Sequence, residues 1–396
     1  MSTSAGTRLV RALRLRHQGL VAGRRWPSIP STVAGMLALQ AQDRTAATAA
    51  ISLRTDGRPD GSEVLASLAE GTIVRNRPSR GTLQITAPED LRWLSALQTP
   101  RSIAAAVKRR SSIGVTAEMV AEVERIVRSE LAGGATRTRG ELVAACAAAG
   151  TELDGSQAGH VLRHLTEAMA IVFAEPRGRD DAFALADAWI ADPRRAEGDA
   201  ALAELAIRFV TARGPVTPAC LGWWSNLAMG DVRRGIDVAG DALEHVEIDG
   251  AAYLVPTGAA DLGGDDVEAA LAEPLLLPAF DEYLLGYRSR DAVLDDAHAA
   301  LVVPGRNGVF RPIVVVDGEV VATWSATAKT TELAVSIQPF GGSALDGAAL
   351  DGPVLDGLGR RVVEHAAFLG RTADPTVERA RRDDGAIAVV AQSTSR

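Results

Sequence analysis

The feature of this sequence that most constrains its fold is a run of helical patterns that ends in two short alternating segments. Apolar residues recur at helical spacing over residues 7–23, 30–38 and 46–53, and Ser31 is the expected N-cap of the second helix. The segments TIVRNR and TLQIT follow, joined by PSRG, and predict a β-hairpin over residues 72–86. Helices followed by a hairpin predict a winged helix.

The same order returns twice along the chain. Helical patterns over residues 119–131, 139–149 and 157–168 precede AIVFAE and AFALAD, and patterns over residues 199–213 and 217–227 precede HVEI and AAYLVP around an Asp-Gly turn. The last third differs, because IVVV, EVVATWS and ELAVSIQPF predict strands before a closing helix near residues 358–369.

These patterns predict an α+β fold of tandem winged-helix modules with a small β-rich C-terminal domain. The expected modules are a first winged helix over residues 1–115, a second over 116–192, a third over 193–256, and the C-terminal domain over 257–396.

The charge of the chain is unevenly distributed. Residues 1–114 hold 17 Lys and Arg against 7 Asp and Glu, whereas the remainder holds 25 against 43, which gives −8 overall. A basic N-terminal part can hold DNA while the acidic remainder limits unspecific attraction. The abundance of arginine is equally compatible with genome composition.

Several function classes are excluded by missing motifs. The sequence has no apolar run of the roughly 18 residues that a membrane span needs, and its first 20 residues interleave Arg with Leu, so we expect a cytoplasmic protein without a membrane partner. Cys146 and Cys220 are too few for a zinc finger or an iron–sulfur cluster. Neither GxxxxGK[ST] nor GxGxxG occurs, and we expect no cofactor.

Two residue pairs invite a chemical interpretation. His160 and His164 are spaced to share one helix face, but no third ligand is evident, so solvated or half-buried histidines are favoured over a metal site. Trp223 and Trp224 are adjacent and could stack on bases, although anchoring a helix in the core is the favoured use.

The acidic pair Asp281 and Glu282 follows the apolar run EPLLLPAF. A buried acid there could act in catalysis. We favour a structural role, in which these carboxylates accept backbone N–H groups or pair with Arg288 or Arg290.

Two amides, Gln40 and Gln42, stand at the end of the apolar segment MLALQAQD. On a continuous helix they would point about 200° apart, so they can serve one site only if the helix ends here. Asp43 is a suitable N-cap for a following helix, which makes such a break credible. The alternative is that one Gln bonds the free carbonyls of the helix end and the other faces water.

Several segments in chain order resemble landmarks of the AlkZ/YcaQ winged-helix DNA glycosylases. They are LALQAQD, RNRPSRGTLQITAPEDLRWL, RFVTARGPVT with WWS, LLLPAFDEYLLGYRSR and PIVVVDGEVVATWS. The resemblance implies tandem winged helices around a DNA-binding cleft. It also implies that Gln40 and Gln42 are catalytic, as in the AlkZ branch. Two positions depart from the pattern: Gln84 stands where a histidine is expected, and Arg77 where a tryptophan is common.

The resemblance further implies that the predicted hairpin of residues 72–86 contacts DNA. Alternation in TIVRNR places Arg75 and Arg77 on one face, and we expect these two and Arg80 to point toward DNA, with Thr82 and Gln84 as further contacts. The expected partner is double-stranded, preferably alkylated DNA, bound by a monomer.

An all-amide site suits a monofunctional glycosylase that hydrolyses the N-glycosidic bond of cationic alkylpurines, namely N7-alkylguanine or N3-alkyladenine, bulky or crosslinked adducts included. A cationic base leaves readily, so orienting water and stabilising an oxocarbenium-like sugar suffice. We expect Gln42 to do this and Gln40 to bond the helix end. The alternatives are a non-catalytic winged-helix DNA-binding protein or regulator, and a protein that sequesters a DNA-damaging metabolite.

Overall fold

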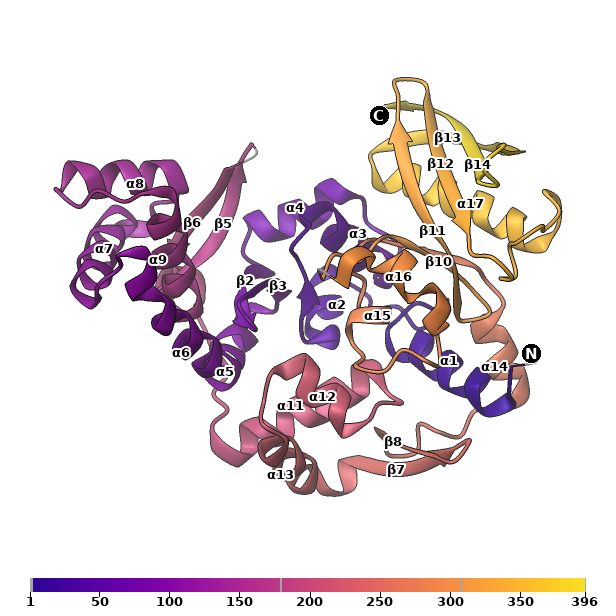
Figure 1. Cartoon of the computed structure of the whole chain (residues 1–396), viewed down its shortest axis with the longest axis horizontal. Helices are drawn as coiled ribbons and strands as arrows, with labels where there is room; N and C mark the ends of the chain where they lie inside the picture. The colour runs from indigo at the N-terminus through magenta and orange to yellow at the C-terminus, as the bar shows by residue number, and fades with distance from the viewer. Residues whose placement is uncertain (1–2, 179, 307, 396) are drawn as a thin grey trace.

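The computed structural model describes residues 3–178, 180–306 and 308–395, and it combines helices with three antiparallel sheets (Figure 1). The predicted mixture of helix and sheet is confirmed. The first group of elements is α1 (Ala5–His17), α2 (Ile29–Met36), β1 (Leu39–Gln40), α3 (Arg44–Arg54), α4 (Gly61–Ala69), β2 (Val74–Ser79), β3 (Thr82–Thr86), α5 (Pro88–Gln98) and α6 (Pro100–Arg109).

The first hairpin, made of β2 and β3, occupies the span predicted for it. Three helices of this group, α4, α5 and α6, were not predicted. The cap assigned to α2 was wrong, because Ser28 is the N-cap and Ser31 is the third helical residue that closes a reciprocal capping box with it.

The second and third groups also place helices before a hairpin. The second contains α7 (Ala117–Glu130), β4 (Arg137–Thr138), α8 (Arg139–Ala148), α9 (Gly155–Glu167), β5 (Ile171–Arg177), β6 (Asp180–Leu185) and α10 (Ala186–Trp189). The third contains α11 (Gly198–Arg213), α12 (Pro218–Ser225), α13 (Met229–Ala239), β7 (Leu243–Ile248) and β8 (Ala251–Pro256). The predicted elements of both groups occur within a few residues of their expected ends, and β4, α10 and α13 are additional.

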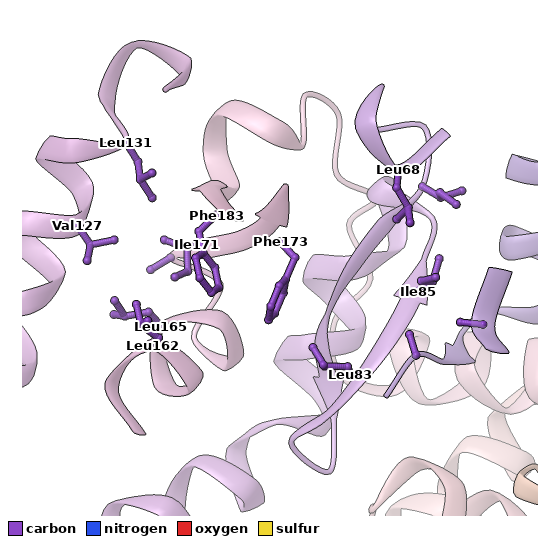
Figure 2. Packing of buried hydrophobic residues seen from close by; sticks show 14 of the residues in the cluster. Leu68, Leu83, Ile85, Val127, Leu131, Leu162, Leu165, Ile171, Phe173 and Phe183 are labelled. Carbon is purple, nitrogen blue, oxygen red and sulfur yellow. The ribbon is translucent and has the colours of Figure 1, made fainter. Parts of the chain in front are cut away.

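The first two hairpins are joined in a single six-stranded sheet of order β1-β3-β2-β5-β6-β4. The junction is the antiparallel pairing of Arg75 in β2 with Phe173 in β5. In Figure 2, Phe173 lies between the side chains of the second group, such as Phe183 and Ile171, and those of the first hairpin, such as Ile85. The first hairpin and the second group therefore share one sheet and one hydrophobic core, whereas Ala12 and Leu15 of α1 pack in a cluster with the C-terminal part.

The C-terminal part is built on a second six-stranded sheet of order β13-β14-β12-β11-β10-β9. Its elements are α14 (Gly264–Leu271), β9 (Leu275–Leu277), α15 (Glu282–Leu285), α16 (Ala299–Val302), β10 (Ile313–Val316), β11 (Glu319–Ala328), β12 (Glu332–Pro339), α17 (Pro353–Phe368), β13 (Arg371–Arg381) and β14 (Ile387–Ser395). The three predicted strands and the closing helix are present. Within the described residues, no helix is long and apolar enough to cross a membrane.

A buried ion pair connects the first group to the C-terminal part. Both Arg54 guanidinium Nη atoms donate to the Asp281 carboxylate, at 2.9 and 2.7 Å, and both side chains are almost fully buried. Arg54 also donates to Gln18 Oε1 at 2.9 Å, and Gln18 Nε2 donates to the hydroxyl of Tyr287 at 2.9 Å. The chain preceding α15 is thereby fixed against α1 and α3.

Replacing one partner of this pair should be strongly destabilising. We expect Arg54→Leu to lower the free energy of unfolding by about 3–5 kcal/mol, because it leaves the Asp281 carboxylate buried without its counter-charge. The double variant Arg54→Leu/Asp281→Leu should lose less than the two single variants together. Urea denaturation measures both, and a single-variant loss below about 1 kcal/mol would contradict this role.

Candidate active site

The chain changes from helix to extended strand just before the two glutamines. α2 ends at Met36, and Leu37 adopts a positive φ of 65° that turns the backbone into β1. Leu39 and Gln40 pair with β3, opposite Ile85 and Gln84, and the Ala41 N–H continues the ladder to Leu83 O at 2.7 Å. Gln42 follows β1 in a bend, and its side chain reaches the backbone of β3. The predicted helix break is confirmed.

Asp43 caps α3 as predicted, since its Oδ1 accepts from the Ala46 N–H at 3.0 Å. The next helix, α3, therefore begins at Arg44, two residues after Gln42. The extended segment is therefore short and held at both ends.

Gln40 is held through its backbone, which leaves its side-chain oxygen unused. Its N–H donates to Glu282 Oε1 at 3.2 Å, whereas its own Oε1 is buried and accepts no hydrogen bond from the described residues. The expectation that its amide bonds the helix end is wrong. Arg213 does so, donating to the carbonyls of Met36 at 3.0 Å and Ala38 at 2.9 Å.

Gln42 is exposed and bonds to the first hairpin. Its Oε1 accepts from the Leu83 N–H at 3.1 Å, which links the glutamine-bearing segment to β3. The Nε2 end of the amide remains as a donor at the surface.

Glu282 is the centre of the contacts behind this segment. Its Oε2 accepts from Arg213 Nε and Nη2 at 3.1 and 2.8 Å and from the Trp224 indole N–H at 3.2 Å. All three side chains are buried. The structural interpretation of Asp281 and Glu282 is confirmed, but the suggested pairing with Arg288 or Arg290 is wrong.

The true partners of these two carboxylates, Arg54 and Arg213, lie 227 and 69 residues away in sequence. Trp224 serves the core, as favoured from the sequence. The neighbouring Trp223 is only partly buried and carries the Arg80 guanidinium over its ring, 4.7 Å from the centroid.

The basic residues of the first hairpin have different surroundings. Arg75 is buried, donates to Asp181 at 2.7 Å, and lies over the Phe173 ring at 4.9 Å. Arg77 donates to the Gly81 carbonyl at 2.7 Å, and burial, followed by the nearby Arg163 charge, lowers its pKa to about 10. Arg80 lies at the turn, beside a cleft.

The last two predicted DNA contacts are Thr82 and Gln84. Thr82 donates from its hydroxyl to Ser79 O at 3.1 Å. Gln84 is buried, and as the strand partner of Gln40 it faces the same side of the sheet. The structure thus places Gln84 opposite the first glutamine and inside the protein.

His160 and His164 lie on α9 in partly buried positions. Nowhere in the described part of the chain do three or more His, Cys, Asp or Glu side chains gather in a way that could hold a metal ion.

The fold is similar to that of the solved Streptomyces sahachiroi DNA glycosylase AlkZ, with a TM-score of 0.74 and 24% sequence identity, over 93% of this chain and 98% of that one. A curated relative from the same organism, an interstrand DNA cross-link repair glycosylase, is 30% identical over 335 residues, which are 81% of this chain and 88% of the relative. Residues 33–367 match the family model described as DNA glycosylase AlkZ-like. The chain belongs to the AlkZ-like DNA glycosylase family.

The contacts of Glu282 predict a loss of excision without a loss of DNA binding. In Glu282→Gln the charge opposite Arg213 is removed, so the backbone of residues 36–40 is held less firmly. We expect a fall of about 10–100-fold in the single-turnover rate of base excision at saturating protein, since small misplacements of reacting groups have effects of this size.

The DNA dissociation constant of the Glu282→Gln variant should stay within about twofold of the wild-type value. Glu319→Gln is the matched control, because Glu319 also pairs with an arginine, Arg11, but in the C-terminal sheet. Equal excision rates for Glu282→Gln and wild type, in protein shown to be folded, would disprove the positioning role.

Proposed function

We propose that this DNA glycosylase hydrolyses the N-glycosidic bond of cationic alkylpurines, N7-alkylguanine or N3-alkyladenine. The proposal is carried by one observation: Gln40 and Gln42 are amides, and the carboxylate in contact with their segment, Glu282, is already bonded within the protein. Glu282 accepts from the Gln40 backbone N–H and is bonded to Arg213, and the neighbouring carboxylate, Asp43, caps α3. A site with amide acceptors and no free carboxylate suits a leaving group that is already activated.

The reaction needs little from the protein. Water adds to C1′ as the bond from C1′ to N9 breaks, the electron pair of that bond neutralises the cationic purine, and the proton of the water passes to solvent. A carbonyl dipole that orients this water also stabilises the positive charge that develops on the sugar.

Gln40 fits this task better than Gln42. Its Oε1 is buried and has no donor among the described residues, whereas Gln42 Oε1 already accepts from Leu83. Buried acceptors are normally bonded, and an exception is a candidate for a functional role. We therefore assign water orientation to Gln40 and the fixing of the first hairpin to Gln42, which reverses the roles expected from the sequence.

Bulky and interstrand-crosslinked adducts are included in the proposed substrates. The curated relative is a cross-link repair glycosylase, and the aromatic rings beside the first hairpin, Phe173 and Trp223, are covered by Arg75 and Arg80. Rings covered in this way do not offer a platform for a fully extruded base. This supports processing of the lesion from the groove of double-stranded DNA.

We also infer that the three groups of helices with hairpins are winged-helix modules and that the protein acts as a monomer. Each group places its hairpin directly after its helices, as a winged helix does.

Substitution of the glutamines tests the mechanism. On a duplex with N7-methylguanine, we expect Gln40→Ala to lower the single-turnover rate of base release by about 100-fold or more, the size of effect seen when one preorganised dipole is removed. Gln42→Ala should lose about tenfold, because only the tie to Leu83 is cut.

Both glutamine variants should bind DNA as the wild type does, and Gln40→Glu should retain part of the rate, since a carboxylate also orients water. Release of the free base is followed by chromatography. If the wild type releases no base from methylated, bulky-adduct or crosslinked DNA, the proposal is wrong and the protein binds DNA without this activity. If Gln40→Ala releases the base at the wild-type rate, Gln40 has no part in the mechanism.

A further inference from the structure

Helix α6 and the turn after it form a basic segment without compensating acids. No Asp or Glu occurs between Leu91 and Ala117, while Arg101, Lys108, Arg109 and Arg110 all lie in that interval. No residue of α6 is buried, and the first three of these basic side chains are exposed.

The basic residues of α6 form no ion pair with any described residue. Exposed arginines elsewhere commonly do, as on α7, where Arg125 pairs with Glu122 at 2.6 Å and Arg128 with Glu124 at 2.8 Å. An exposed, uncompensated row of positive charges favours an anionic partner.

Three groups of the fold meet at one basic cleft of about 600 Å³. It is lined by Arg80 of the first hairpin, Arg101 and Arg109 of α6, His160 and Arg163 of α9, and Asn226 after α12. Arg101 Nη1 donates to Asn226 O at 3.1 Å, so α6 is fixed to the third group, and Arg163 is the lining arginine that pairs with a carboxylate, Glu167, at 2.9 Å.

The local field of this cleft is positive. Burial lowers the pKa of His160, and the charges of Arg110, Arg163 and Arg109 lower it further. An anion placed there would be attracted by several cationic groups at once.

The cleft lies next to the glutamine-bearing segment. Arg80 precedes Leu83 by three residues, and Leu83 is bonded to Gln42, so the Cα atoms of Arg80 and Leu83 are at most about 11 Å apart. A duplex that brings a lesion to the glutamines therefore has its backbone within reach of this cleft.

We propose that α6 and the basic cleft form a phosphate-binding surface for duplex DNA, with Arg101 and Arg109 as its principal contacts. This inference rests on the action of the chain on DNA, and it places a major backbone contact on α6, outside the first hairpin. Since phosphate contacts carry no base identity, the surface is expected to bind undamaged and damaged duplex alike.

The salt dependence of DNA binding tests this surface. Two phosphate contacts contribute about 1.8 to the slope of log K against log salt concentration. We expect Arg101→Gln/Arg109→Gln to make the slope less steep by about 1.8 and to weaken binding to an undamaged duplex at least tenfold near 0.1 M salt.

The matched control is Arg125→Gln/Arg128→Gln, which removes the same charge from exposed helical arginines that are already paired. It should leave the slope within about 0.4 of wild type. An unchanged slope in the α6 variant, or an equal change in both variants, would overturn the inference. The slope is measured on undamaged DNA, so it is decided independently of whether the wild type releases a base.

Discussion

The candidate site depends on the buried contact between Glu282 and Arg213. Neither charge would be stable alone in the interior, because desolvation of each costs several kcal/mol. Here the Glu282 carboxylate accepts from Arg213, Trp224 and the Gln40 backbone, and Arg213 donates onward to the carbonyls of Met36 and Ala38. The two buried charges therefore neutralise each other, and the remaining Arg213 hydrogen bonds fix the course of the backbone between α2 and β1.

This contact also explains why four separate segments must meet for the site to exist. The glutamines come from the first group, Arg213 ends α11, Trp224 lies in α12, and Glu282 begins α15. The neighbouring pair of Arg54 with Asp281 fixes the other side of the same acidic dipeptide. Two adjacent carboxylates thus bind two arginines from different elements, so displacement of either element would leave a charge buried without a partner.

The sequence was sufficient where the signal is local. Alternation over residues 72–86 predicted the first hairpin, and Asp43 correctly marked the restart of helix after the glutamines. Contacts between distant segments were not predicted, because periodicity shows which face of an element is apolar but not what covers it. The segment TIVRNR predicts that Arg75 is a basic surface residue. In the structure, the pairing of β2 with β5 brings Asp181 next to it.

The same limit applies to strands with little apolar alternation. β13 was missed because five of its eleven residues are charged. It lies at an outer position of its sheet, and its pairing with β14 decides its structure. The Gln40 contact to Glu282 likewise spans 242 residues, and no spacing rule connects them.

The arginines named above form two sets, which differ in burial and in whether they bond a carboxylate. Arg54, Arg75 and Arg213 each bond a carboxylate and are buried, whereas Arg101 and Arg109 are exposed and bond none in the described part of the chain. Arg80 connects the two sets, because it lies at the turn of the hairpin whose next strand binds Gln42. Through Leu83 of β3 this turn is linked to the amide of Gln42, so the proposed phosphate-binding surface and the glutamine-bearing segment meet in one hairpin.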